Sequence, residues 1–192
     1  MLRLSRKLFD LACQSGLISQ SDKEIYQFGF EVTLLKCAHI ITMLLIGLAF
    51  HMLVEAALFL VAYSSLRIYA GGYHSKSRLR CYIISCFMMC AVLLIAKQQQ
   101  FNPTLFLCAA FVSMCIIFLL SPVENRNNPL DDTERKHYKK RTYIIGFVQL
   151  FFLVLFFFLG LYTYLIILSL SIFALSLMII IGYSQVRIEG WF

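Results

Sequence analysis

The chain contains two long apolar runs in its second half, YIIGFVQLFFLVLFFFLG at residues 143–160 and YTYLIILSLSIFALSLMIIIGY at residues 162–183. Neither run contains Asp, Glu, Lys or Arg. A helix needs about 20 residues to cross the hydrocarbon core of a bilayer, because each residue adds about 1.5 Å of rise. Both runs therefore predict membrane-spanning helices, and the bilayer is the solvent in which this chain folds.

The composition of the whole chain agrees with these two runs. Of its 192 residues, 60% are hydrophobic and 14% are charged, and the mean hydropathy is +0.79. These values lie outside the range of soluble globular domains. We therefore expect one all-α, polytopic membrane domain over residues 1–192, with about six spans and no second, soluble domain. The expected spans are residues 30–49, 52–67, 81–97, 103–120, 143–160 and 162–183.

The first two spans are the least well delimited. No Pro, Asn or run of charge between Gly47 and Met52 marks a turn. An alternative with four spans, in which the first two segments are partly immersed, therefore stays open. The fourth span is better defined, because Pro103 follows a polar turn and its missing N–H costs nothing at a helix start. The polar residues of that turn are Gln98, Gln99, Gln100 and Asn102.

The distribution of Lys and Arg predicts the orientation in the membrane, since short cytoplasmic loops retain positive charge. Residues 1–27 contain four, residues 67–80 four, residues 121–142 six and the stretch after residue 183 one, whereas Lys97 lies on the other side. Both termini and the 67–80 stretch should therefore be cytoplasmic. Residues 121–142, rich in Pro, Asn and charge, are expected to form a solvated cytoplasmic loop.

The remaining features exclude several other classes of protein. Residues 1–27 lack the long apolar core of a removable signal peptide, and their pattern predicts an amphipathic helix on the membrane surface or an ordinary packing helix. The net charge of +7 does not predict nucleic-acid binding, because the basic residues are spread among short loops. Seven cysteines occur without CxxC spacing, so we expect no disulfide framework, no metal site and no cofactor.

One stretch gathers the residues that could carry chemistry: RIYAGGYHSKSRLRC at residues 67–81. A Cys–His pair supports nucleophilic catalysis, because the base converts the thiol into thiolate and can then protonate the leaving amine. On one continuous helix, His74 and Cys81 would be separated by about 10.5 Å of rise, which is beyond hydrogen-bond reach. His74 must therefore precede the helix that contains Cys81.

The residues around the pair permit this arrangement. Gly71 and Gly72 can adopt backbone conformations closed to other residues, and Ser75 or Ser77 can cap a helix that enters the membrane. Cys81 would then lie in the first turns of that helix, where the helix dipole and two neighbouring arginines favour the thiolate. The backbone N–H groups of the Gly-Gly pair could also stabilise an oxyanion.

Simpler interpretations stay open on the residues alone. A Cys and a His at this separation can occur by coincidence in a chain with seven Cys and four His. The Gly-Gly pair can be an ordinary loop, and Arg67 can be a snorkelling charge that orients the span. The main rival from another functional class is a non-catalytic peptide transporter or channel, in which this stretch forms a hinge.

The residues RIYAGGYH followed by Cys81 resemble the signature of the accessory gene regulator B family, membrane peptidases that process autoinducing peptide precursors in Gram-positive bacteria. SPVENRNNP at residues 121–129 resembles a second motif of this family. The resemblance implies that Cys81 is the nucleophile and His74 the base, with Arg67 and Gly72 as supporting site residues. Gly71 stays a candidate through its backbone N–H group.

The same resemblance implies a function in quorum sensing. A multi-pass enzyme of the bacterial cell membrane would cleave the carboxyl-terminal tail from a short amphipathic precursor peptide, leave a thioester on Cys81 and promote thiolactone or lactone closure. Its active site would face the cytoplasm, and residues 121–142 would help to position the precursor. The precursor and membrane lipids are the expected partners and nucleic acid is not, while a homodimer is one alternative that the sequence leaves open.

Overall fold

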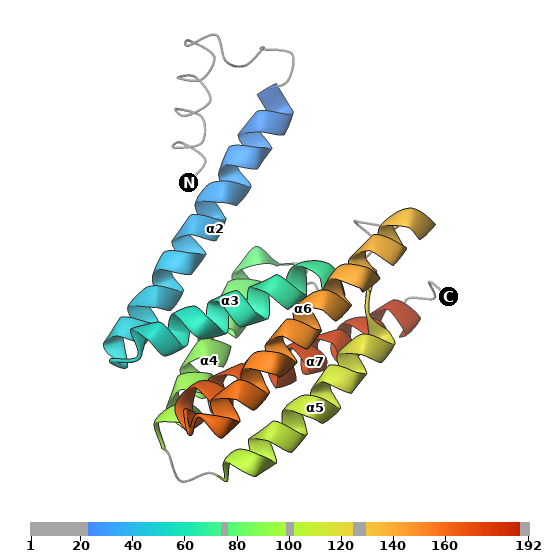
Figure 1. Cartoon of the computed structure of the whole chain (residues 1–192). Helices are drawn as coiled ribbons and strands as arrows, with labels where there is room; N and C mark the ends of the chain where they lie inside the picture. Colours follow the sequence, from blue (N-terminus) through green and yellow to red (C-terminus); the bar gives the residue numbers. More distant parts are fainter. Residues whose placement is uncertain (1–22, 74–76, 99–101, 125–129, 189–192) are drawn as a thin grey trace. The chain divides into compact units, whose positions relative to one another are not determined.

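The computed structural model describes residues 23–73, 77–98, 102–124 and 130–188. The chain divides into two compact units, residues 1–45 and residues 46–192. The described part contains six helices (Figure 1), which are α2 (Lys23–Ala49), α3 (Leu53–Ala70), α4 (Arg78–Lys97), α5 (Pro103–Leu120), α6 (Asp132–Phe158) and α7 (Tyr162–Ile188).

Each of these six helices is long and apolar enough to cross a membrane. The prediction of an all-α fold with six spans is confirmed, and the separate helices α2 and α3 favour six spans over the four-span alternative. Within the described ranges, extended pairing is limited to one isolated bridge between Gly71 and Val123. The expectation of a single domain over residues 1–192 stays a prediction.

The turn between α2 and α3 is built on His51, whose φ of 57° lies in the left-handed region. The N–H of His51 donates to the carbonyl of Leu48 (3.0 Å), and that of Met52 donates to the carbonyl of Gly47 (2.8 Å). These bonds satisfy carbonyl groups at the end of α2 in the pattern of a Schellman cap. A Cβ on Gly47 would lie 2.5 Å from the Cβ of Ala56, so this glycine lets the last turn of α2 approach the first turn of α3 closely.

Helix α7 is the centre of the second unit. It packs against α3, α4, α5 and α6, and its residues Ile172, Leu175 and Ile179 are fully buried. Helix α6 is joined to α3 by a polar contact in the core, where the side-chain amide of Gln149 donates to the carbonyl of Ala62 (2.8 Å). Such interhelical hydrogen bonds help to set the packing of membrane helices, because lipid offers no competing partner.

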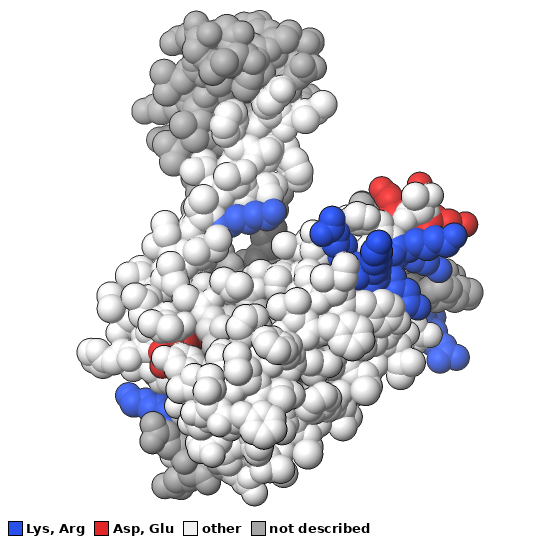
Figure 2. All heavy atoms as spheres, in the orientation of Figure 1, with Lys and Arg blue, Asp and Glu red and all other residues white. Residues whose placement is uncertain are grey.

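The outer surface of the second unit is strongly apolar, as the side chains of Phe87, Leu119 and Phe158 illustrate with exposed fractions of 75%, 80% and 80%. Figure 2 shows a broad surface of uncharged residues and a group of Lys and Arg side chains gathered over the start of α6. Large exposed apolar surfaces are typical of a protein whose surroundings are lipid. Together with the six apolar helices, this surface indicates a multi-pass membrane protein.

Helix α6 begins at Asp132, well before the span expected from residue 143. The carboxylate of Asp131 accepts hydrogen bonds from the N–H groups of Thr133 (2.6 Å) and Glu134 (2.8 Å), and the Glu134 carboxylate accepts from the N–H of Asp131 (3.2 Å). This reciprocal capping box starts the helix before the chain reaches its apolar run. The prediction of a loop throughout residues 121–142 is therefore wrong for residues 132–142.

Candidate active site

The segment between α3 and α4 and the segment between α5 and α6 contain the two family-like motifs, and they contact each other in the structure. The N–H of Val123, which follows α5, donates to the carbonyl of Ala70 at the end of α3 (3.0 Å). Gly71 and Val123 form a parallel bridge between the two connections. Both connections lie at the same end of the second unit (Figure 1), so the residues that precede His74 are held against the start of the second motif.

The Gly-Gly pair bends the chain where α3 ends. Gly71 has a φ of 75° and Gly72 a φ of 124°, and both values favour glycine. A Cβ at Gly71 would collide with the carbonyl oxygen of Val123, and a Cβ at Gly72 would collide with the guanidinium of Arg67. Residues 71–73, here called the catalytic bend because they precede the predicted base His74, therefore favour glycine at both positions for reasons of conformation, and at Gly71 also for reasons of space.

Arg67 holds the catalytic bend from the side of α3. Its guanidinium donates to the carbonyl oxygens of Gly71 and Tyr73, an arrangement suited to a planar group with several donors in fixed directions. The N–H of Gly71 donates to the carbonyl of Arg67 (3.2 Å), so a role of this N–H toward an oxyanion would require that bond to be broken. The observed contacts of Arg67 are with backbone carbonyl groups, and its role toward a substrate stays a prediction.

Helix α7 packs directly against the catalytic bend. The N–H of Tyr73 donates to the carbonyl of Met178 on α7 (2.8 Å). One turn later on α7, a Cβ at Gly182 would lie 2.6 Å from the carbonyl carbon of Gly72 and 2.6 Å from the nitrogen of Tyr73. These are backbone atoms that cannot rotate away, so the absence of a side chain at Gly182 is what lets the bend reach α7.

Cys81 lies in the first turns of α4, as the sequence predicted. The helix begins at Arg78 after the N-cap residue Ser77, whose side chain makes no capping hydrogen bond. The N–H of Cys81 donates to the carbonyl of Ser77 (3.2 Å), and the Cys81 side chain is exposed. The first turn of α4 contains no acidic residue, so no carboxylate there offsets the positive end of the helix dipole.

The side chain of Tyr63 on α3 lies in the neighbourhood of both Arg67 and Cys81. It is within electrostatic range of the guanidinium of Arg67 and of the sulfur of Cys81. The thiol at the start of α4 and the guanidinium that holds the catalytic bend are thus close to the same side chain. The other two cysteines of α4, Cys86 and Cys90, are half-buried further along the helix.

His74 lies outside the described residues, so its pairing with Cys81 stays a prediction. Cys81 lies on a helix that begins at Arg78, four positions after His74. Ser75 and most of the amphipathic segment expected at residues 1–27 also lie outside the described ranges.

Sequence reasoning did not identify α7 as part of the site. The available signal was Gly182 within the apolar run at residues 162–183, because an isolated glycine in a membrane helix often marks a close approach of two backbones. Met178 offered no signal, since its contribution is a backbone carbonyl that any residue would supply.

Comparison with known proteins adds the evolutionary context. The family model described as accessory gene regulator B matches residues 5–181. AgrB-like protein 2 of Clostridium perfringens strain 13 is 30% identical over 141 residues, which are 69% of this chain and 66% of that protein. An AgrB-like protein of Clostridium perfringens strain SM101 gives the same values. An AgrB-like protein of Clostridium acetobutylicum is 23% identical over 121 residues, covering 62% of this chain and 58% of that protein.

The chain thus spans just under two thirds of the length of the Clostridium perfringens relatives that it matches, at 66%. No solved structure matches it. The family model covers most of the chain, including the catalytic bend, Cys81 and α7 as far as residue 181. This chain therefore belongs to the accessory gene regulator B family.

Proposed function

We propose that this chain is a membrane cysteine endopeptidase that matures the precursor of a quorum-sensing peptide. Family membership supports a part in the accessory gene regulator system of quorum sensing. The observation that carries the proposal is the exposed thiol of Cys81 in the first turns of α4, a few residues after a bend that three parts of the chain hold in place. A thiol at the positive end of a helix dipole is suited to nucleophilic attack.

The proposed reaction begins when His74 accepts the proton of the Cys81 thiol. The thiolate adds to the carbonyl carbon at the junction between the signal segment and the tail of the precursor. The C–N bond then breaks while His74 returns its proton to the leaving amine. The tail departs with a new amino terminus, and the signal segment stays bound to Cys81 as a thioester.

The thioester then provides the energy for ring closure. An internal Cys thiol or Ser hydroxyl of the signal segment attacks the thioester carbonyl, His74 accepts its proton, and the thiolate of Cys81 leaves. The product is a thiolactone or a lactone, according to the internal nucleophile. The apolar surroundings of a site at the membrane surface help to keep water away from the thioester.

The orientation and the role of Arg67 follow from the same proposal. The excess of Lys and Arg in the loops at this end supports a cytoplasmic active site in the bacterial cell membrane, which a cytoplasmic precursor can reach. Arg67 would support the reaction by bracing the carbonyl groups of the catalytic bend, which directly precedes His74 in the sequence. A transporter or channel would require neither an exposed thiol at this place nor a braced bend before His74.

The decisive experiment measures tail release by the purified full chain in liposomes supplied with a precursor peptide. Cys81→Ala should abolish release, whereas Cys86→Ala and Cys90→Ala on the same helix should retain it. His74→Ala should lower the rate by about 10²–10⁴-fold, the usual contribution of general acid–base catalysis. The wild-type chain should also form a hydroxylamine-sensitive adduct at Cys81. Release by Cys81→Ala at the wild-type rate would show that another residue is the nucleophile.

A further inference from the structure

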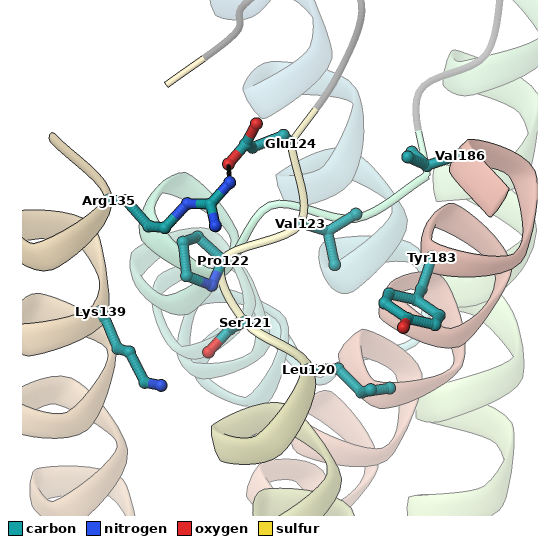
Figure 3. A pocket seen from close by; sticks show the side chains of 9 residues that line it. All are labelled: Leu120, Ser121, Pro122, Val123, Glu124, Arg135, Lys139, Tyr183 and Val186. Atoms are coloured by element: carbon teal, nitrogen blue, oxygen red, sulfur yellow. Dashed lines mark hydrogen bonds and ion pairs between the residues drawn. The ribbon is translucent and has the colours of Figure 1, made fainter. Parts of the chain in front are cut away.

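A pocket of about 210 Å³ lies next to the catalytic bend, between the segment that follows α5, the start of α6 and the end of α7 (Figure 3). One part of its lining is apolar and includes Val123, Tyr183 and Val186. Another part is charged and consists of Arg135 and Lys139 from α6 and of Glu124 after α5. The pocket thus joins apolar surface to positive charge.

Lys139 supplies the positive charge that is open to a ligand. Arg135 is paired with Glu124, so that pair is neutral. The nearby carboxylates of Asp131 and Glu134 accept backbone hydrogen bonds in the capping box of α6. Among the described residues, Lys139 forms no ion pair, and Figure 3 shows its side chain extending from α6 toward the segment 121–124. An ammonium group in this position favours an anionic ligand.

The size and the lining of the pocket narrow the class of ligand. Pockets for drug-sized molecules usually measure about 300–1,000 Å³, so this one has room for one or two residues of a peptide. A carboxylate next to an apolar side chain would match both parts of the lining. A lipid would need space for its headgroup and for acyl chains, which the pocket does not provide.

The pocket is also directly connected to the catalytic bend. Val123 belongs to its lining, and the same residue bonds to Ala70 and pairs with Gly71. Tyr183 follows Gly182, the α7 residue against which the bend lies. An extended peptide advances about 3.3 Å per residue, so a chain bound in the pocket passes near the bend within a few residues.

We infer that this pocket binds the tail of the precursor through a tail carboxylate, with Lys139 as the partner of the carboxylate. Val123, Tyr183 and Val186 contact an apolar side chain next to it. The inference rests on the proposed function, because it names the part of the precursor that the enzyme recognises. The tail is held on one side of the catalytic bend while the signal segment extends toward Cys81.

Binding of a tail peptide tests this inference without any cleavage. The full chain carrying Cys81→Ala is placed in phosphatidylcholine vesicles, and fluorescence anisotropy reports binding of a labelled peptide with two acidic residues, one apolar residue and a free carboxyl terminus. Adding Lys139→Gln should weaken binding about tenfold, the usual effect of losing one charge-assisted hydrogen bond. Adding Lys136→Gln, on the same turn of α6 but outside the lining, should leave binding unchanged.

A neutral version of the peptide turns the experiment into a double-mutant cycle, with one change in the protein and one in the peptide. With its acidic residues replaced by Asn and Gln and its terminus amidated, the peptide should bind the parent chain weakly, and Lys139→Gln should weaken it no further. Equal binding of the acidic and neutral peptides would overturn the inference, and so would equal losses in the two lysine variants.

Two further outcomes separate the alternatives. If phosphatidylglycerol in the vesicles raises the thermal stability of the chain through Lys139 while the acidic peptide does not bind there, the pocket holds a lipid headgroup and the inference is wrong. The binding measurement does not depend on Cys81. Tail release by Cys81→Ala would therefore refute the proposed mechanism. It would not affect the inference about the pocket, which the binding measurement alone tests.

Discussion

Replacing Gly182 by Ala tests whether α7 positions the catalytic bend. The new methyl group would lie 2.6 Å from the carbonyl carbon of Gly72 and 2.6 Å from the backbone nitrogen of Tyr73. Heavy atoms in ordinary contact are about 3.5–4.0 Å apart, so a displacement of about 1 Å is needed. Because both neighbours are backbone atoms, the bend itself must move away from α7.

A displacement of this size should impair catalysis more than it impairs folding. A misplacement of about 1 Å can lower a reaction rate about 10²-fold. The same movement weakens the bond from Tyr73 to the carbonyl of Met178, and one hydrogen bond contributes about 0.5–1.5 kcal/mol. The buried core around Ile172 and Leu175 is unaffected. We therefore expect about 10²-fold slower tail release at a normal protein level.

The assay measures tail release in liposomes together with the reaction of Cys81 with a thiol reagent, which should stay normal. Gly29→Ala is the silent control, because a Cβ there meets nothing within 4 Å. Gly146→Ala is the packing control, because its Cβ would press on the side chains of Phe118 and Met114 between α5 and α6. Unchanged release by Gly182→Ala, or an equal loss in Gly146→Ala at equal abundance, would refute the positioning role of α7.

Two further predictions concern the support of the bend and the orientation in the membrane. Arg67→Lys should slow tail release about tenfold, because one ammonium cannot reproduce two carbonyl contacts of a planar guanidinium; an equal loss in Arg187→Lys, at the exposed end of α7, would contradict this reason. A variant that keeps Cys81 as its single cysteine should react with a membrane-impermeant thiol reagent in inside-out vesicles, and labelling of intact cells from outside would overturn the cytoplasmic orientation.

The spans could be predicted because the bilayer imposes one length on every crossing helix. The fourth span was expected at residues 103–120, and α5 is Pro103–Leu120. Helix α6 departs from its expected bounds because hydropathy reports where a helix enters lipid and not where it begins in water. Its beginning is decided by the capping box of Asp131 and Glu134. This local pattern lies within a charged stretch, which was therefore interpreted as a loop.

Close approaches of the backbone could not be predicted in the same way. The left-handed residue that ends α2 is His51, although glycine or asparagine usually takes this place. The glycines at 71 and 72 did predict a bend, because their freedom is a property of the residue itself. The acceptors of Arg67 were not predictable, since backbone carbonyl groups become a binding site only once the bend has formed.

The catalytic bend depends on three supports that are far apart in the sequence: Arg67 on α3, Val123 after α5, and α7 with Met178 and Gly182. A shift of any of these elements would move the bend. The proposed tail pocket is lined by parts of two of them, the segment of Val123 and the end of α7. A bound tail would therefore press on the supports of the bend that directly precedes His74 in the sequence. Binding energy from a part of the substrate that does not react would then act at the reacting bond, which is how remote contacts raise kcat.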